Sequence, residues 1–284
     1  MTEISKLEFD LLKKLLFKIS GIEVQDNKRY LFTTRLGEYL KEKGYSGFSE
    51  LYNRLVSGGD PQLTREFVQA MTTHESSFFR DTRPFNLLTN MLLPQVAAIN
   101  RENARYLSPR IRILSAGCSL GQETYTIAMC VKAWLETQSV FTETDVTIIG
   151  IDISRRVLDR AREGVYAENE VGTAMPALMR QKYFAGAPGG NLTVCEPVRA
   201  MVKFAEHNLI DPLDSYGKFD VVFCRNVIIY FPVDLQRKIL GRFADLLFKH
   251  GALIMGSSES TFNLSDAYEV VGAENTTYFR PKGR

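Results

Sequence analysis

The stretch Ile111-Arg-Ile-Leu-Ser-Ala-Gly-Cys-Ser-Leu-Gly-Gln-Glu, residues 111–123, decides the fold class. An apolar run typical of a buried strand stops at Gly117, and a helix pattern follows from Glu123 to Leu135. The same order recurs further along the chain, with buried apolar runs at 146–152, 219–224 and 252–256 and helix patterns at 154–162 and 235–248. Strands that alternate with helices predict an α/β fold with a doubly wound, Rossmann-like parallel sheet.

The regions around this sheet have other patterns. Residues 1–104 show only helical periodicity, so we predict an all-helical N-terminal domain at 1–80 and a linker helix at 81–104. The α/β domain would then occupy 105–284. Residues 165–205 contain several glycines and prolines between short β-like runs, which predicts a small antiparallel β insertion. The end of the chain, at about 268–280, is expected to form an antiparallel edge hairpin.

Composition narrows the class of protein. The 284 residues carry 35 basic and 33 acidic side chains, and this small excess argues against a nucleic-acid substrate. The four cysteines form no C-x-x-C pair, so we expect no metal site and a reducing compartment. No apolar run approaches the length of about 18 residues needed to span a membrane, and the N-terminus does not resemble a signal peptide. We therefore expect a cytoplasmic protein with no membrane insertion.

A glycine turn follows one of the expected strands and polar side chains follow two others, at the edge where open α/β sheets bind ligands. Gly117 opens a turn that lets a ligand approach the backbone, and Asp152 at the end of the next strand could accept hydrogen bonds from ribose hydroxyls. Arg225 and Asn226 follow a third strand. The alternatives are that Asp152 only caps the next helix and that the Arg-Asn pair belongs to a structural network.

The expected ligand is an adenosine without a pyrophosphate. The loop at 115–123 is not a G-x-x-x-x-G-K-[ST] phosphate loop, and it lacks the third glycine of G-x-G-x-x-G. S-adenosylmethionine (SAM) fits such a site, since it has a ribose and an amino-acid end but no phosphate. Glu123, in the first turn of the helix, could meet its amino group or a ribose hydroxyl.

Four segments together resemble the chemotaxis receptor methyltransferases, the CheR family. They are Thr-Thr-His-Glu-Ser-Ser-Phe-Phe-Arg-Asp at 72–81, Ala-Gly-Cys-Ser-Leu-Gly-Gln-Glu-Thr-Tyr-Thr-Ile-Ala at 116–128, Gly-Ile-Asp-Ile-Ser at 150–154 and Phe-Cys-Arg-Asn-Val-Ile-Ile-Tyr-Phe at 223–231. The resemblance covers nearly the whole chain. It implies SAM-dependent methylation of glutamate side chains on the cytoplasmic helices of chemoreceptors, with S-adenosylhomocysteine (SAH) as the product.

By position, the resemblance also implies a set of cofactor contacts. They fall on Ser76, Arg80, Glu123, Asp152, Asn208, Leu209, Arg225 and Asn226. The family often has a small polar residue where His74 stands, and threonine where Ser76 stands. Ser76 keeps the hydroxyl. We place His74 with the cofactor-binding residues, with a structural histidine as the alternative.

The expected chemistry needs no general base, because a glutamate side chain with a pKa of about 4.3 is already ionised at neutral pH. The enzyme must instead place and desolvate the carboxylate. We assign this task to Arg80, whose fork can hold a carboxylate, and to Tyr230, four residues after Asn226. The alternative for Tyr230 is packing in the core beside Phe231.

Partner recognition follows less directly. Residues 28–43 hold five basic and two acidic side chains, so Arg35 and Lys41 could steer a glutamate-rich receptor, unless this is an ordinary solvated helix surface. In the family the β insertion can dock a receptor's C-terminal tail, but the loop at 186–192 is short. We therefore expect a tether-independent monomer. The competing functions are a non-catalytic SAM-binding signalling module and a nucleic-acid methyltransferase.

Overall fold

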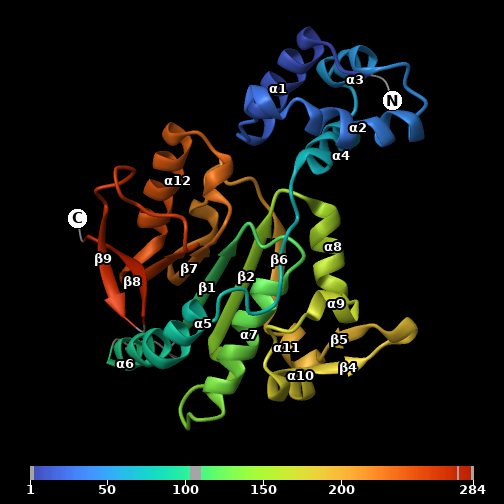
Figure 1. The fold of residues 1–284 in the computed structure, drawn as a ribbon. Helices are drawn as coiled ribbons and strands as arrows, with labels where there is room; N and C mark the ends of the chain where they lie inside the picture. Colours follow the sequence, from blue (N-terminus) through green and yellow to red (C-terminus); the bar gives the residue numbers. More distant parts are fainter. Residues whose placement is uncertain (1–2, 103–109, 274, 283–284) are drawn as a thin grey trace.

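The computed structural model describes residues 3–102, 110–273 and 275–282. Its centre is a seven-stranded sheet in the order β6-β2-β1-β7-β8-β10-β9 (Figure 1). The strands are β1 Ile111–Ala116, β2 Val146–Asp152, β6 Val202–Glu206, β7 Phe219–Cys224, β8 Leu247–Met255, β9 Tyr268–Ala273 and β10 Thr276–Pro281. The five strands from β6 to β8 are parallel, and β10 runs antiparallel to both β8 and β9. This confirms the predicted α/β class and its edge hairpin.

Both faces of the sheet are covered by helices, because its strand residues alternate between two hydrophobic clusters. Ile111 and Ile113 of β1 pack with α7 (Gln122–Leu135), whereas Leu114 and Ala116 pack with α12 (Val233–Leu246). Helix α8 (Arg155–Glu163) follows β2. Such two-sided burial explains why these strands appear in the sequence as continuous apolar runs.

One boundary between a helix and a strand differs from the prediction. The sequence predicts a helix at 235–248 and a strand that begins at Ala252. In the structure, β8 is already extended at Leu247. Phe219 of β7 pairs with Leu247, whereas Val221 pairs with Ala252, so the register shifts between the two pairs. The strand is therefore set by pairing with β7, a long-range contact that local periodicity does not report.

The N-terminal bundle has its own core, formed by the apolar faces of four helices. These are α1 Lys6–Ser20, α2 Tyr30–Glu42, α3 Phe48–Val56 and α4 Pro61–Met71, with the single turn η1 Asp26–Lys28 before α2. Ser5 and Glu8 form a capping box at the start of α1, and Gly21 ends this helix with a φ of 74°. The bundle meets the α/β domain where Asn208 Nδ2 donates to the Ile19 carbonyl (2.9 Å).

The expected linker at 81–104 is built into the α/β core. It consists of α5 (Arg83–Leu87), a π-helical turn η2 (Leu88–Leu92) and α6 (Leu93–Glu102). Its apolar side chains lie in the same cluster as α7 and the sheet. The domain boundary at 104/105 lies outside the described residues, and the boundary at 80 stays a prediction.

The β insertion is a three-stranded antiparallel sheet in the order β3-β5-β4. Phe184 of this unit and Tyr166 both pack edge-on against Phe78, with ring centroids 5.2 and 4.9 Å away. Residues 202–205, which the expected range included, instead begin β6 at the edge of the large sheet. The unit contains β3 Val165–Tyr166, α9 Glu168–Val171, α10 Ala177–Tyr183, β4 Phe184–Gly186, η4 Pro188–Gly190, β5 Leu192–Val194 and α11 Glu196–Arg199.

Three further single turns complete the described elements: η3 Glu143–Asp145, η5 Asp214–Tyr216 and η6 Ile228–Tyr230. Within the described ranges, no helix is both long enough and apolar enough to cross a membrane. The same residues contain no group of three or more histidine, cysteine or acidic side chains arranged to hold a metal ion.

Candidate active site

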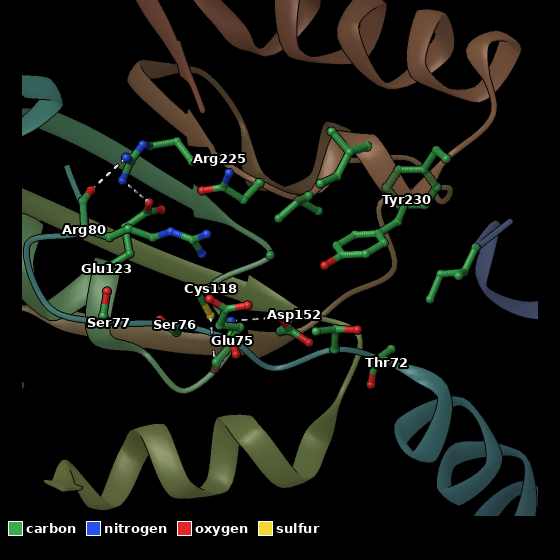
Figure 2. Close-up of a pocket in the computed structure, with 18 of the residues that line it drawn as sticks. Thr72, Glu75, Ser76, Ser77, Arg80, Cys118, Glu123, Asp152, Arg225 and Tyr230 are labelled. Atoms are coloured by element: carbon green, nitrogen blue, oxygen red, sulfur yellow. Dashed lines mark hydrogen bonds and ion pairs between the residues drawn. The ribbon is translucent and has the colours of Figure 1, made fainter. Parts of the chain in front are cut away.

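A cavity of about 300 Å³ lies at the carboxyl ends of β1, β2 and β7 (Figure 2). The loops after these strands form one wall, and the segment from Met71 to Arg80, which joins the bundle to the α/β domain, forms the other. This is the ligand position expected of an open α/β sheet. Of the predicted site residues, the cavity is lined by Ser76, Arg80, Gly117, Glu123, Asp152, Arg225, Asn226 and Tyr230.

The glycine loop after β1 brings backbone close to the cavity. Gly117 has a φ of 71°, and a Cβ built there would overlap the side chain of Val227. The N–H groups of Gly117 and Cys118 donate to the carbonyl of Ile151, at 2.8 and 2.9 Å, which ties the loop to the end of β2. Glycine is therefore required at 117 both by its conformation and by the close approach of the loop after β7.

Asp152 holds two loops through one carboxylate. Its Oδ2 accepts from the Ser119 N–H and its Oδ1 accepts from the Ser154 N–H, both at 2.9 Å. Burial raises the pKa of Asp152 above its ordinary value, although these hydrogen bonds and the nearby His74 act in the opposite direction. Asp152 thus holds the turn that leads into α8 and also faces the cavity.

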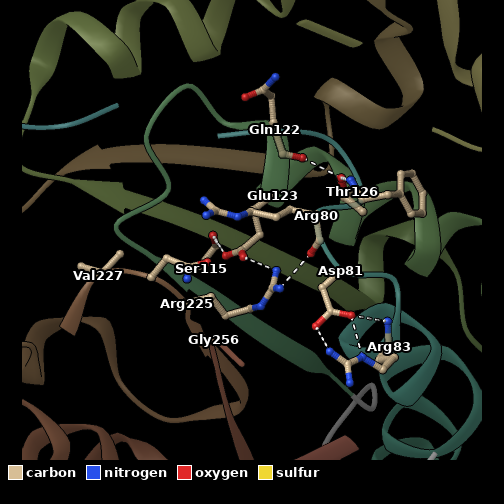
Figure 3. Close-up of polar contacts among 12 residues, drawn as sticks. Arg80, Asp81, Arg83, Ser115, Gln122, Glu123, Thr126, Arg225, Val227 and Gly256 are labelled. Atoms are coloured by element: carbon tan, nitrogen blue, oxygen red, sulfur yellow. Dashed lines mark hydrogen bonds and ion pairs between the residues drawn. The ribbon is translucent and has the colours of Figure 1, made fainter. Parts of the chain in front are cut away.

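Glu123 and Arg225 form a buried ion pair at the floor of the cavity (Figure 3). Arg225 Nη1 lies 3.1 Å from Glu123 Oε2, and Ser115 Oγ donates to the other carboxylate oxygen at 2.9 Å. Arg225 also donates to the carbonyl of Arg80 (2.8 Å) and lies over the Phe85 ring. Burial raises the pKa of Glu123 and outweighs the opposing effect of Arg225.

A strained turn aims Arg80 into the cavity. Phe79 has a φ of 51°, and its N–H donates to Thr126 Oγ1 of α7 at 3.2 Å. Buried Phe78 and Phe79 anchor the turn on either side. The Arg80 guanidinium makes no hydrogen bond or ion pair with any described residue, and it points into the cavity (Figure 2). Strained backbone of this kind is common where a site must be held in one geometry.

Two unpartnered polar atoms show that the cavity suits a polar ligand. Ser119 Oγ and Arg225 Nε are buried, and neither has a hydrogen-bond partner in the described part of the chain. Both residues line the cavity beside the carboxylates of Asp152 and Glu123. Together these donors and carboxylate acceptors fit the hydroxyls, amino group and carboxylate of a nucleoside joined to an amino acid.

Three predicted cofactor residues lie away from this wall. Asn208 is occupied by Ile19 of the bundle, and Leu209 is buried, with its carbonyl accepting from Arg242 (3.1 Å). His74 lines a neighbouring cavity of about 940 Å³, and its Nε2 lies 2.8 Å from Thr72 Oγ1. Burial lowers the pKa of His74 below its ordinary value, although the nearby Asp152 acts in the opposite direction.

The two predicted steering residues differ in their surroundings. Arg35 Nη1 donates to the Met71 carbonyl (2.6 Å), and its Nη2 donates to Thr73 Oγ1 (3.0 Å). Arg35 therefore holds the segment that forms the cavity wall, and its fork is not free for a partner. The charge pattern at 28–43 did not show which basic side chain is occupied by contacts within the chain. Lys41 is exposed.

Tyr230 is 38% exposed at the rim of the cavity, whereas Phe231 is buried. The alternative of core packing thus applies to Phe231 alone. Glu75 and Ile229 also line the cavity, although neither was predicted from the sequence. Both stand beside predicted residues, so each segment contributes more of its length than the single motif positions indicated.

Comparisons with known proteins agree with this geometry. Residues 7–72 match the model of the CheR methyltransferase all-alpha domain, and residues 74–277 match that of the CheR methyltransferase SAM binding domain. The chain belongs to the CheR methyltransferase family. It is 36% identical over 277 residues to chemotaxis protein methyltransferase 1 of Pseudomonas aeruginosa, covering 97% of this chain and 98% of the relative.

Two other relatives are similar at the same level. The chemotaxis protein methyltransferase of Vibrio parahaemolyticus is 37% identical over 270 residues, 94% of each chain. That of Borreliella burgdorferi is 36% identical over 282 residues, 98% of this chain and 93% of the relative. The protein is accordingly a SAM-dependent methyltransferase of the chemotaxis type, which confirms the predicted family, enzyme class and cofactor.

Proposed function

We propose that this CheR-family enzyme transfers the methyl group of SAM to glutamate carboxylates of methyl-accepting chemoreceptors. The observation that carries the proposal is the Arg80 guanidinium, which has no hydrogen-bond or ion-pair partner in the described part of the chain and faces the same cavity as Asp152 and the exposed rim residue Tyr230. The edge of the sheet could bind a nucleoside, and the Arg80 cation in the same cavity could bind a carboxylate. This combination suits a reaction between SAM and a carboxylate.

The chain's own residues would divide the work as follows. Asp152 would accept hydrogen bonds from the ribose hydroxyls, and the Gly117 loop would leave room for the nucleoside. Ser76, Glu123, Arg225 and Asn226 would surround the amino-acid end, while His74, Asn208 and Leu209 would support the pocket from outside its wall. When bound, SAM would supply a methyl group on a sulfonium, with SAH as the leaving group of an in-line displacement.

The acceptor carboxylate needs placement more than activation, since it is ionised at neutral pH. Arg80 would hold it, and the Tyr230 hydroxyl would donate a hydrogen bond that orients the attacking oxygen. Correct placement of two reactants can contribute about 7–11 kcal/mol to lowering a barrier. Phe231, which also lines the cavity, would help to keep water away from the same oxygen.

Tyr230→Phe tests the placement role without disturbing the fold. We expect kcat to fall about tenfold, because one oriented hydrogen bond contributes about 1.4 kcal/mol. The free energy of unfolding should hardly change, since the ring is partly exposed and the Tyr230 carbonyl keeps its bond from Glu23 N–H (2.9 Å). Tyr30→Phe, on the exposed start of α2, is the matched control. Wild-type turnover in Tyr230→Phe would remove Tyr230 from the mechanism.

The affinity for SAH should depend on pH through Asp152. Its pKa is raised by burial, and only the ionised carboxylate can accept hydrogen bonds from hydroxyls with both oxygens. Binding therefore favours the charged form, so affinity should rise with pH through the raised pKa and then stay constant. Calorimetric titrations from about pH 4, near the ordinary pKa of an aspartate, to about pH 8 would measure this. Asp152→Asn should bind weakly and lose the pH dependence, and a flat profile for the wild type would contradict the assignment.

For partners, we propose a monomeric enzyme of the cytoplasm that acts on receptor helices without a tail tether and does not act on nucleic acid. The short turn η4 between β4 and β5 supports independence from the tether, since Gly186 already pairs with Leu192. Lys41 remains a candidate for steering, whereas Arg35 would act by holding the cavity wall.

The proposal is tested with SAM labelled on its methyl group. The enzyme is incubated separately with chemoreceptor-containing membranes and with bulk RNA and DNA. Alkali releases volatile methanol from carboxyl methyl esters and not from N-methyl groups. Alkali-labile label on receptor-sized bands is the expected result, and alkali-stable label on nucleic acid would replace glutamate with a base as the acceptor.

A further inference from the structure

Glu259 accepts an unusual number of backbone hydrogen bonds. Its Oε2 accepts from the N–H groups of Asn226 (2.7 Å) and Gly256 (2.8 Å). Its Oε1 accepts from the N–H groups of Val227 and Ile228, both at 3.1 Å. The residue is only 9% exposed, and no described basic side chain forms an ion pair with it. Within the described ranges, the hydrogen-bond partners of this carboxylate are thus backbone N–H groups.

Three of these donors belong to consecutive residues, which form an anion-binding concavity of backbone N–H groups. Asn226 has a φ of 59°, a left-handed conformation that turns its N–H and the next two toward one point. Gly256 is needed to complete the arrangement, because a Cβ there would lie 2.6 Å from Glu259 Oε2. The Glu259 carboxylate thus provides the acceptor for backbone N–H groups of the loop that would otherwise be unsatisfied.

The clamped loop is the one that carries the site. Asn226, Val227, Ile229 and Tyr230 all line the cavity, and Val227 occupies the space that the missing Cβ of Gly117 leaves. Figure 3 shows Val227 and Gly256 on loops beside the Arg225 side chain. Glu259 itself does not line this cavity. It lines a separate cavity of about 250 Å³ behind it, together with Asp81 and Arg83.

We propose that Glu259 is a positioning residue, whose carboxylate fixes the 226–230 loop so that Tyr230 and Val227 face the reacting groups. The inference rests on the proposed function for its activity readout only. Replacing the Glu259 side chain by the methyl group of alanine should release the loop while Asp152 and the Gly117 loop, on the other side of the cavity, stay in place.

The experiment compares Glu259→Ala with the wild type in the presence and absence of formate. We expect kcat/KM for the receptor to fall about tenfold or more, since small misplacements of catalytic groups are costly, and the Kd for SAH to change much less. Formate is small enough to enter the cavity behind the loop and should restore activity with increasing concentration. Sodium chloride at equal ionic strength should not.

A second readout does not depend on the acceptor. Hydrogen exchange of the amides at 226–228 should become faster in Glu259→Ala and slow again with formate. If the wild type shows no receptor methylation, the proposed function fails, but this exchange result still decides the role of Glu259. The control is Asp220→Asn, because Asp220 is a fully buried carboxylate that accepts from Arg112 N–H (2.8 Å) near the start of β7, far from the carboxyl edge.

Asp220→Asn should lower stability with unchanged kcat/KM and no response to formate. Should Glu259→Ala fail to fold, Glu259→Gln carries the test, since it keeps the shape and loses the charge. Its amide NH2 would face two backbone N–H donors in place of an acceptor, so the expected result is a lower kcat/KM with a lower melting temperature in a variant that still folds. Unaltered kcat/KM in the folded variant, or unchanged exchange of the three amides, overturns the proposal.

Discussion

Replacing Arg80 with alanine is expected to lower kcat/KM for the receptor by about 100-fold. Hydrogen bonds to charged groups contribute about 1.5–3 kcal/mol, and about 1.4 kcal/mol corresponds to a factor of ten. The guanidinium makes no bond to described residues, so its removal breaks no internal contact. Stability should therefore change little, and the loss should appear in catalysis.

The chemistry of the side chain gives a graded test of this role. Arg80→Lys keeps the charge but loses the planar fork, so we expect a loss of only about tenfold. Arg54→Ala is the matched control, because Arg54 forms an exposed ion pair with Glu50 on α3 of the bundle. Steady-state kinetics with varied receptor and with varied SAM would assign the loss to one substrate. Equal activity of Arg80→Ala and Arg54→Ala would show that Arg80 holds no reacting group.

Replacing Arg225 with methionine should have the largest effect on stability. The substitution leaves Glu123 buried without its cation and removes the donor to the Arg80 carbonyl. Removing one partner of a buried ion pair costs about 3–5 kcal/mol. Urea unfolding of the wild type and the variant at neutral pH would measure the difference. The surface variant Arg54→Ala should lose less than about 1 kcal/mol.

The pH dependence of this loss has a defined sign. Burial already raises the pKa of Glu123, and removal of Arg225 takes away an effect that lowers it. A carboxyl with a raised pKa in the folded state stabilises the fold at acid pH, and this contribution disappears as pH rises through that pKa. The deficit of Arg225→Met should thus be smaller near about pH 5 than near about pH 8. The double variant with Glu123→Gln should recover much of the stability, and equal deficits at both pH values would contradict the ion-pair interpretation.

Much of the site was predictable because it follows local rules. Strands that end at Gly117 and Asp152 place their loops at one sheet edge, whatever the details of packing. The end of α1 at Gly21 has a similarly local cause, since glycine adopts the left-handed cap without strain. These features depend on residues that are close in sequence.

The parts that sequence reasoning missed depend on distant partners. Glu259 lies in a polar loop with no periodicity, and three of its four donors are about 30 residues away in sequence. In the sequence, Arg35 cannot be told from a solvated basic residue on a helix surface. Its role depends on the end of α4, where the Met71 carbonyl accepts from its guanidinium. The start of β8 is likewise decided by β7. Such roles arise from tertiary contacts that neither charge pattern nor propensity encodes.

The most direct test of glutamate methylation is tandem mass spectrometry of a purified chemoreceptor cytoplasmic fragment after incubation with the enzyme and SAM. We predict that the mass of one added methylene unit maps to glutamate side chains of the fragment. It should be absent with Asp152→Asn and greatly reduced with Arg80→Ala. A methyl group found only on lysine, arginine or a chain terminus, or none at all while SAH binding is normal, would contradict the proposed function.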